Sequence, residues 1–381
     1  MVSREQSPRV EILASTLVTG GAERVIAALV RGLPRQGLPV RVFCLHGPGE
    51  VGAEIASSGT PLISDVARFK YDLSACVRLA RAWRNGGDAV VLSLDHHDAI
   101  FAGAVASRWA GMRGRLLAVH STGLWGKAGS FSWSDRVVLG SYERIVALAS
   151  AHADYLVERE RVKRERVSII PNGVDTAVFR PARSTEEREG LRRELSIPRE
   201  RFAVAMVAAL RPEKNHGMFL DAAARIAERR RDFLFLIVGE GNEAEKLQRR
   251  AQDLSLGDSV RFLGRRNDVS RILAASDASA LCSWPVVETF PLVVLESMAC
   301  CVPVVATDVG AVREMLVDRQ EGFIVPPGDV SAFAETLMDL ARQPEMRHET
   351  GLKARERVVR DFGIDNMINR YAVLIREVLK R

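Results

Sequence analysis

The chain has 381 residues, of which 47% are hydrophobic, and it carries a net charge of +6. This length exceeds that of a usual single core, so we expect a globular protein of two domains. Its five cysteines are odd in number and lack CxxC spacing, which argues against a disulfide framework and a zinc site. The sequence contains no run of about 18 apolar residues and no apolar signal-peptide core, so we expect a cytoplasmic protein.

The positive charge lies in the first half of the chain. Residues 1–180 contain 23 Lys and Arg against 17 Asp and Glu, whereas the remainder contains 31 of each. Excess charge bears on association with partners and not on the fold. Either the first half meets an anionic partner, such as a membrane surface or a phosphorylated acceptor, or its arginines are scattered over a solvated surface.

The chain opens with a predicted strand, Val10–Ala14, then a Gly-Gly loop, a helix over residues 22–35 and a second strand, Val40–Leu45. This order is typical of a nucleotide-binding βαβ unit. The GxGxxG fingerprint is missing and no acid ends the second strand, which disfavours a dehydrogenase. Gly20 and Gly21 either let a ligand approach the backbone closely or form a tight turn.

Three further strands are predicted at Ala89–Leu94, Arg115–His120 and Arg144–Leu148. Residues 95–98, DHHD, follow the first of them and could cap the next helix beside a cleft or bind a metal ion. His120 ends another strand, where open α/β sheets place their ligands. It could equally be a histidine whose hydrogen bonds are made by the backbone.

A charged helix is predicted over residues 151–166, followed by a strand and a Pro-Asn-Gly turn. We place the boundary within the polar segment that follows, which gives an N-terminal domain of residues 1–181 and a C-terminal domain of residues 182–363. The second domain repeats the alternation of strands and helices, so both are predicted to be parallel sheets covered by helices. A last helix, residues 364–381, is predicted to pack across the domain junction.

The stretch from Ser283 to Thr307 is predicted to form a loop, a helix and a strand, with Pro291 in the first helical turn. The N-terminus of such a helix is a ready site for phosphate. If the intervening residues are helical, Glu288 and Glu296 lie roughly 12 Å apart, wider than most glycosidase carboxylate pairs. They could hold separate hydroxyls of one sugar nucleotide, or be a helix-terminal charge and a solvated or core-paired residue.

Six motifs in sequence resemble glycosyltransferase family four, the retaining enzymes of GT-B fold. They are TGGAER (residues 19–24), IIPNGVD (169–175), LRPEKNH (210–216), VGEG (238–241), ETFPLVVLESMA (288–299) and VGAVREML (309–316). The resemblance implies two Rossmann-like domains facing across a cleft, with the nucleotide-sugar donor on the second and the acceptor, a saccharide that is lipid-linked or small, on the first. It implies transfer of a sugar to a hydroxyl in bacterial polysaccharide, glycolipid or glycoconjugate synthesis, with no cofactor, metal or nucleic-acid partner.

The resemblance also assigns roles to individual residues. Glu288 is similar to the first acid of the family's E-x7-E pattern, which faces the donor sugar, and Glu296 to the second, near the ribose. Arg211 and Lys214 resemble the basic residues on the diphosphate, and His120 the histidine near the transferred sugar. The other residues expected at the donor are Gly20, Gly21, Phe290, Pro291, Leu292, Val293, Leu263 and Gly264.

Three positions depart from the family pattern. Ala209 stands where many relatives have an arginine, which leaves Arg211 as the candidate. Thr289 replaces a common glycine, and Cys301 stands where the family usually has a helix-ending glycine. A non-glycine at that last position either accepts backbone strain or ends the helix differently.

Three other functions are compatible with two such domains: a non-catalytic sugar or nucleotide binder, a sugar-nucleotide epimerase and a phosphorylase. No export signal supports a periplasmic receptor, and no local signal marks the pyridoxal-phosphate lysine of a phosphorylase. An epimerase would turn over the donor without any acceptor.

Overall fold

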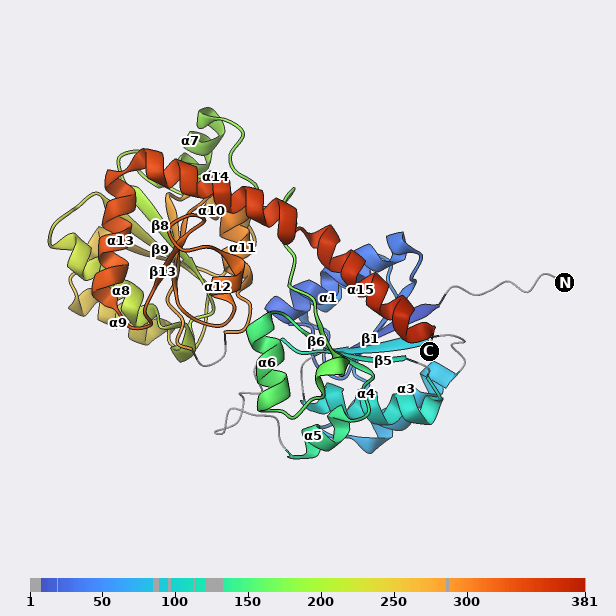
Figure 1. The fold of residues 1–381 in the computed structure, drawn as a ribbon. Coiled ribbons are helices and arrows are strands. Elements are labelled where there is room, and N and C mark those ends of the chain that lie inside the picture. The colour runs from blue at the N-terminus through green and yellow to red at the C-terminus, as the bar shows by residue number, and fades with distance from the viewer. Residues whose placement is uncertain are drawn as a thin grey trace. The chain divides into compact units, whose positions relative to one another are not determined.

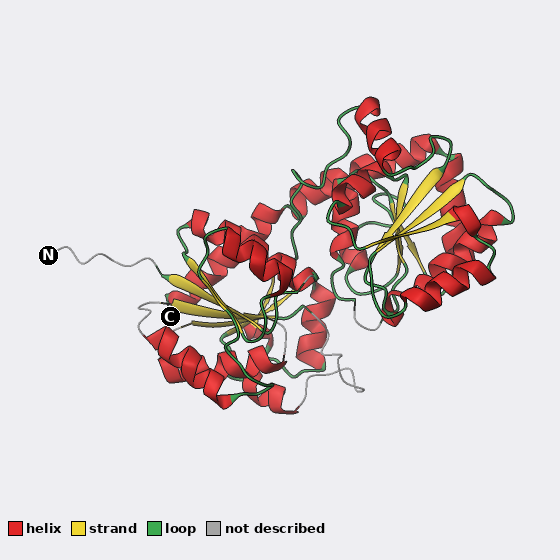
Figure 2. Cartoon of the chain, turned by 180° about the vertical axis from the view of Figure 1, so that it is seen from behind, coloured by secondary structure: helices red, strands yellow, loops and turns green. Residues whose placement is uncertain are grey.

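The structure is a computed structural model that describes residues 8–18, 20–84, 89–94, 97–112, 114–120, 133–285 and 288–380. The chain forms two compact units. The first unit comprises Met1–Asn172 with Ile364–Arg381, and the second comprises Gly173–Gly363. Both are Rossmann-like α/β domains, as predicted, and Figure 2 shows helices on both faces of each sheet. None of the described helices is long and apolar enough to cross a bilayer.

The first unit contains a parallel sheet in the order β3-β2-β1-β4-β5-β6-β7 (Figure 1). Its strands are β1 (Arg9–Ala14), β2 (Val40–Cys44), β3 (Leu62–Ile63), β4 (Ala89–Leu94), β5 (Gly114–Ala118), β6 (Arg144–Ala147) and β7 (Val167–Ile169). Its helices are α1 (Gly21–Gly32), α2 (Gly49–Ser57), α3 (Leu73–Arg84), α4 (His97–Ala110), α5 (Trp133–Leu139), α6 (Ser150–Glu158) and α15 (Ile364–Leu379).

The second unit contains a parallel sheet in the order β10-β9-β8-β11-β12-β13. Its strands are β8 (Phe202–Val207), β9 (Phe233–Val238), β10 (Val260–Gly264), β11 (Ala278–Leu281), β12 (Val304–Thr307) and β13 (Phe323–Val325). Its helices are α7 (Thr185–Glu194), α8 (His216–Ala227), α9 (Ala244–Asp253), α10 (Val269–Ala275), α11 (Leu292–Ala299), α12 (Val312–Met315), α13 (Val330–Arg342) and α14 (Pro344–Asp361).

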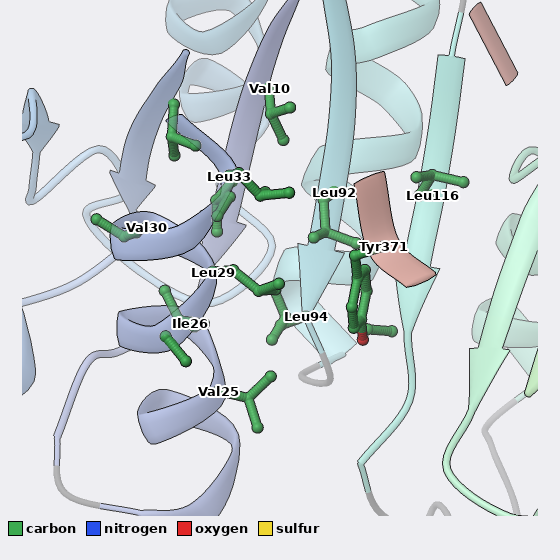
Figure 3. Packing of buried hydrophobic residues seen from close by; sticks show 14 of the residues in the cluster. Val10, Val25, Ile26, Leu29, Val30, Leu33, Leu92, Leu94, Leu116 and Tyr371 are labelled. Carbon is green, nitrogen blue, oxygen red and sulfur yellow. The ribbon is translucent and has the colours of Figure 1, made fainter. Parts of the chain in front are cut away.

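Period-two patterning of the strands builds the core of the first unit on both sides of its sheet. Val10 and Ile12 of β1 point to one face, while Leu13 points to the other and packs with Phe43. On the first face, apolar residues of α1, β1, β4 and β5 belong to one cluster, part of which Figure 3 shows. Tyr371 of α15 is fully buried among them, so the last helix belongs to the core of the first unit.

The predicted helix over residues 151–166 is wrong in length. α6 ends at Glu158, and Arg161 adopts a left-handed conformation with φ of 60°. This turn lets the Val162 N–H donate to the carbonyl of Leu156 and buries the Val162 side chain. Val162 is the only apolar residue of the charged segment 158–166, and its burial after the turn stabilises this ending of the helix.

Cys301 lies in the left-handed region, with φ of 57°, directly after the end of α11. The structure thus follows the first of the two predicted alternatives, strain in place of a different helix end. A non-glycine residue in this conformation destabilises the folded state by roughly 1–2 kcal/mol. Glycine removes this strain, but it also increases the conformational entropy of the unfolded chain, which offsets part of the gain.

Replacing Cys301 with glycine should therefore raise the free energy of unfolding by about 0.5–1 kcal/mol. Denaturant unfolding of the variant beside wild type measures this difference. Cys300→Gly is the matched control, because Cys300 has φ of −82° and gains nothing from glycine's freedom. That control should lose stability, and a loss for Cys301→Gly as well would contradict the strain.

Candidate active site

Lys214 and Glu288 meet where the second sheet reverses its strand order, between β8 and β11. Lys214 ends a 3₁₀ turn after β8, and Glu288 lies in the loop after β11. The Lys214 Nζ is 2.6 Å from the Glu288 Oε2, and these side chains are 24% and 10% exposed. In open α/β sheets, ligands bind at this switch point, outside the carboxyl ends of the strands.

Ser283, in the same loop, also contacts the Glu288 carboxylate. Its Oγ donates to the Glu288 Oε2 at 2.7 Å, and its carbonyl accepts from the Thr307 Oγ1 at 2.8 Å. The next N–H, of Trp284, donates to the carbonyl of Glu213 at 2.9 Å, so the loops after β8 and β11 are joined. The sequence analysis assigned Ser283 no role. Its position between an apolar strand and Glu288 could have indicated that its hydroxyl contacts the carboxylate.

Two glycines allow the backbones around this pair to approach closely. Gly310 has φ of 52°, and a Cβ there would collide with the carbonyl oxygen of Glu288. Gly239 has φ of 144°, and a Cβ there would collide with the carbonyl oxygen of Ala208, which leads from β8 toward Lys214. The VGAVREML and VGEG motifs therefore fix the positions of the two loops.

The residues around the start of α11 differ in detail from the prediction. Pro291 is the N-cap residue and α11 begins at Leu292, so half of the stretch between Glu288 and Glu296 is not helical. The distance estimate of roughly 12 Å, which assumed one continuous helix, therefore does not apply. Glu296 is partly exposed in the second turn, and the first backbone N–H groups of α11 have no acceptor within the helix.

Other residues predicted at the donor lie at the same edge of this sheet or pack behind it. Phe290 is buried, with its ring centroid 5.9 Å from that of Phe362, whereas Leu292 and Val293 are partly exposed. Arg211 is exposed on the segment before Lys214. Leu263 is partly buried near the end of β10, and the Gly264 carbonyl accepts from the Gly239 N–H at 2.8 Å.

His216 lies two residues after Lys214 and is buried at the start of α8. Burial lowers its pKa to about 4, with the Lys214 charge as a second cause. Burial also lowers the pKa of His152 to about 4 in the first unit, where the ring accepts the Leu148 N–H. Both imidazoles are therefore neutral in the folded protein at pH 7.

Acidification from pH 7 to 5.5 should lower the free energy of unfolding by about 2–3 kcal/mol. The unfolded chain protonates these histidines near pH 6.5, whereas the folded chain resists protonation until about pH 4, so the unfolded state binds more protons between these values. Urea unfolding at the two pH values tests this. His216→Gln should reduce the loss and the exposed His348→Ala should not; equal stability at both pH values would contradict the argument.

In the first unit, the predicted residues lie at the carboxyl edge of the sheet. Gly20 and Gly21 form the start of α1, and the Glu23 carboxylate lies so close to Gly20 that a Cβ there would collide with it. His120 follows β5 and is half-buried. Sequence reasoning did not single out Glu23, although it belongs to the TGGAER motif.

The DHHD loop falls partly outside the described residues. Asp95 and His96 are not described, whereas Asp98 is buried and accepts hydrogen bonds from Ser15 and His46. Within the ranges that the structure describes, no group of three or more His, Cys, Asp or Glu side chains is arranged to hold a metal ion.

Each of the two units matches a known glycosyltransferase family. Residues 19–178 match the family described as Glycosyltransferase Family 4, and residues 187–357 match Glycosyl transferases group 1. The putative glycosyltransferase EpsF of Bacillus subtilis is 30% identical, over 90% of each chain. The N-acetyl-alpha-D-glucosaminyl L-malate synthase of Bacillus anthracis is 27% identical, over 81% of this chain and 80% of the relative.

A solved structure has the same fold. HepE of Anabaena, in complex with UDP and glucose, superposes with a TM-score of 0.85 at 20% identity, over 97% of this chain and 100% of HepE. The two family matches follow one another along the chain and correspond to its two Rossmann-like units. The chain therefore belongs to glycosyltransferase family 4 and is a glycosyltransferase of GT-B fold.

Proposed function

We propose that this enzyme transfers a sugar, with retention of anomeric configuration, from a nucleoside diphosphate to an acceptor hydroxyl. The contact between Lys214 and Glu288 at the switch point of the second sheet supports this proposal most directly. It brings a cation suited to a diphosphate and an acid suited to sugar hydroxyls to one place. The binding of UDP and glucose by HepE, a protein of the same fold, agrees with such a donor.

The departing diphosphate sets the electrostatic requirement of the reaction. Negative charge develops on its oxygens as the glycosidic bond breaks, so donors fixed in advance lower the barrier most. Lys214, Arg211 and the first N–H groups of α11 would supply these donors. Arg211 would replace the arginine that many relatives have at the position of Ala209.

Glu288 would hold hydroxyls of the donor sugar, while Glu296 would hold the ribose. Lys214 and Ser283 both contact the Glu288 Oε2, so the carboxylate is oriented before the donor arrives. Oriented acceptors lose little entropy when a substrate binds. Gly20, Gly21 and His120 would contribute from the first unit as the family resemblance implies.

The transfer would need no metal ion. Two side-chain cations and a helix N-terminus would balance the charge for which other enzymes recruit Mg²⁺. Turnover should therefore survive dialysis against EDTA. A loss that added Mg²⁺ or Mn²⁺ restores would overturn this part of the proposal.

Donor identification is the first experiment. Thermal shifts with UDP-, GDP-, ADP- and dTDP-sugars would select the base and sugar, because a ligand that binds the folded state raises the melting temperature. The selected donor should then release nucleoside diphosphate when an acceptor is added, and the product should keep the donor's anomeric configuration by NMR. Donor turnover to an epimer without acceptor, or an inverted product, would refute the proposal.

The first unit would contact an anionic membrane peripherally. Residues 1–180 hold the whole positive excess of the chain, and the exposed Phe69 and Leu73 lie close in sequence to Arg68 and Lys70. Basic and apolar residues together favour an anionic lipid surface. At low salt, the enzyme should sediment with vesicles that contain phosphatidylglycerol and not with pure phosphatidylcholine vesicles; equal partitioning would count against this contact.

A further inference from the structure

Trp284 lies in the loop after β11, beside the pair of Lys214 and Glu288. It directly follows Ser283, whose Oγ contacts the Glu288 carboxylate, and its own N–H donates to the Glu213 carbonyl at 2.9 Å. Ser283 is 1% exposed, whereas Trp284 is 41% exposed. Single exposed apolar residues are common on protein surfaces, so exposure alone indicates no function. This indole differs because two loops fix its position at the edge of the sheet where ligands bind.

The loop after β13 contacts the ring of Trp284. Gly328 of that loop has φ of 81°, and a Cβ there would lie 3.0 Å from the Cη2 and 3.2 Å from the Cζ3 of Trp284. The outer edge of the indole therefore packs against the Gly328 backbone, while the Trp284 N–H is bound to Glu213 in the loop after β8. Because the ring is ordered before any ligand arrives, little entropy is lost when a ligand packs on it.

The strand order separates the two ends of a nucleotide-sugar along this edge of the sheet. Lys214, expected at the diphosphate, follows β8, and Leu263, also expected at the donor, lies in β10 on the same side of the switch point. Glu288, Trp284 and Gly328 follow β11 and β13 on the other side. A donor whose diphosphate lies between Lys214 and the start of α11 therefore directs its sugar, the end that Glu288 holds, toward Trp284.

An exposed indole and an oriented carboxylate are complementary to different parts of a hexose. The carbons of a pyranose carry hydrogens that form an apolar face, and this face packs on the electron-rich face of an aromatic ring. The hydroxyls lie around the rim of the sugar, where a carboxylate accepts their hydrogen bonds. An axial hydroxyl interrupts the apolar face, so an aromatic ring distinguishes hexoses that differ in one such group. The indole carries no charge and therefore offers little to a diphosphate.

We propose that Trp284 packs on the apolar face of the transferred sugar and determines in part which hexose the enzyme accepts. Glu288 holds the hydroxyls of the same sugar, and Gly328 is the positioning residue that sets the angle of the ring. The proposal rests on the proposed transfer and specifies how its donor is selected.

Calorimetric titration separates contact with the sugar from contact with the nucleotide. The ligands are the nucleotide-sugar selected by thermal shift and the corresponding nucleoside diphosphate. Trp284→Ala should raise the Kd of the nucleotide-sugar about tenfold, the effect of losing one aromatic contact, and leave the Kd of the diphosphate within about twofold. Trp284→Phe should retain part of the affinity, and Trp109→Ala, whose residue is 51% exposed on α4, is the control. Equal weakening of both ligands by Trp284→Ala, or weakening of neither, would overturn the proposal.

Displacing the ring without removing it is a second test. Gly328→Ala adds a methyl group against the indole, and Gly59→Ala is the matched control, because Gly59 has the same φ of 81° but no atom within 4 Å of an added Cβ. Gly328→Ala should raise the Kd of the nucleotide-sugar about threefold or more, since the ring must move, and Gly59→Ala should not change it. An unchanged Kd in Gly328→Ala would contradict the positioning of the ring.

Kinetics with the accepted donor and its 4-epimer test the selection itself. Trp284→Ala should lower the ratio of kcat/KM between the two sugars about threefold or more, because the ring that distinguishes their faces is gone. An unchanged ratio would refute the selection. Failure of every nucleotide-sugar as donor would refute the transfer, whereas normal donor binding and transfer by Trp284→Ala would refute only the contact with the sugar.

Discussion

Replacing Lys214 with alanine should lower turnover about 10²-fold or more, the effect of deleting one fixed donor to transition-state charge. The ammonium lies at the switch point of the second sheet, held by the 3₁₀ turn and by the Glu288 carboxylate. When the diphosphate departs, this cation would meet growing negative charge without having to move far. Steady-state release of nucleoside diphosphate measures the loss.

The matched control is Lys246→Ala. Lys246 also pairs with a glutamate, Glu243, but its side chain is 72% exposed on α9. Such surface pairs contribute little, so turnover should stay within about twofold of wild type. Circular dichroism and the melting temperature establish that the Lys214 variant is folded. Near-normal turnover in a folded Lys214→Ala protein would exclude the lysine from the site.

Replacing Glu288 with alanine should abolish sugar transfer while the nucleotide still binds. The carboxylate would face the sugar, whereas the diphosphate would be held by Lys214, Arg211 and the start of α11. Removing Glu288 also frees the Lys214 ammonium from its partner at 2.6 Å. The affinity for nucleoside diphosphate should therefore be kept or raised, because the carboxylate no longer competes for the cation.

Calorimetric titration with nucleoside diphosphate and a product assay measure these two quantities on one protein. Glu288→Gln refines the test, since the amide keeps the shape and can still accept from Ser283 while losing the charge. Glu240→Ala, whose side chain is 68% exposed in the loop after β9, is the control. Unchanged transfer by Glu288→Ala would contradict its assigned role.

The contact between Lys214 and Glu288 could be expected from the sequence only in outline. Each residue follows a predicted strand, and parallel strands present their carboxyl ends at one edge of a sheet. The helix assumed between Glu288 and Glu296 is absent over the first half of that stretch, because Pro291 caps α11. Helix propensity does not determine the first residue of a short helix when contacts with residues distant in sequence fix the loops on either side of it.

The sequence alone determined the alternation of strands and helices, the two Rossmann-like domains and the family. Period-two and period-3.6 patterns and short motifs can be recognised within a local stretch of sequence, without knowing which distant residues are in contact. Only the tertiary structure decided that Ser283 contacts the Glu288 carboxylate and that Gly310 leaves room for the Glu288 backbone. It also decided that α15 belongs to the first unit, and that Ser15, His46 and Asp98 meet. Those contacts join residues far apart in the chain. Which residues meet depends on the order of the strands in the sheet. That order is established when the sheet packs, and no local stretch of sequence specifies it.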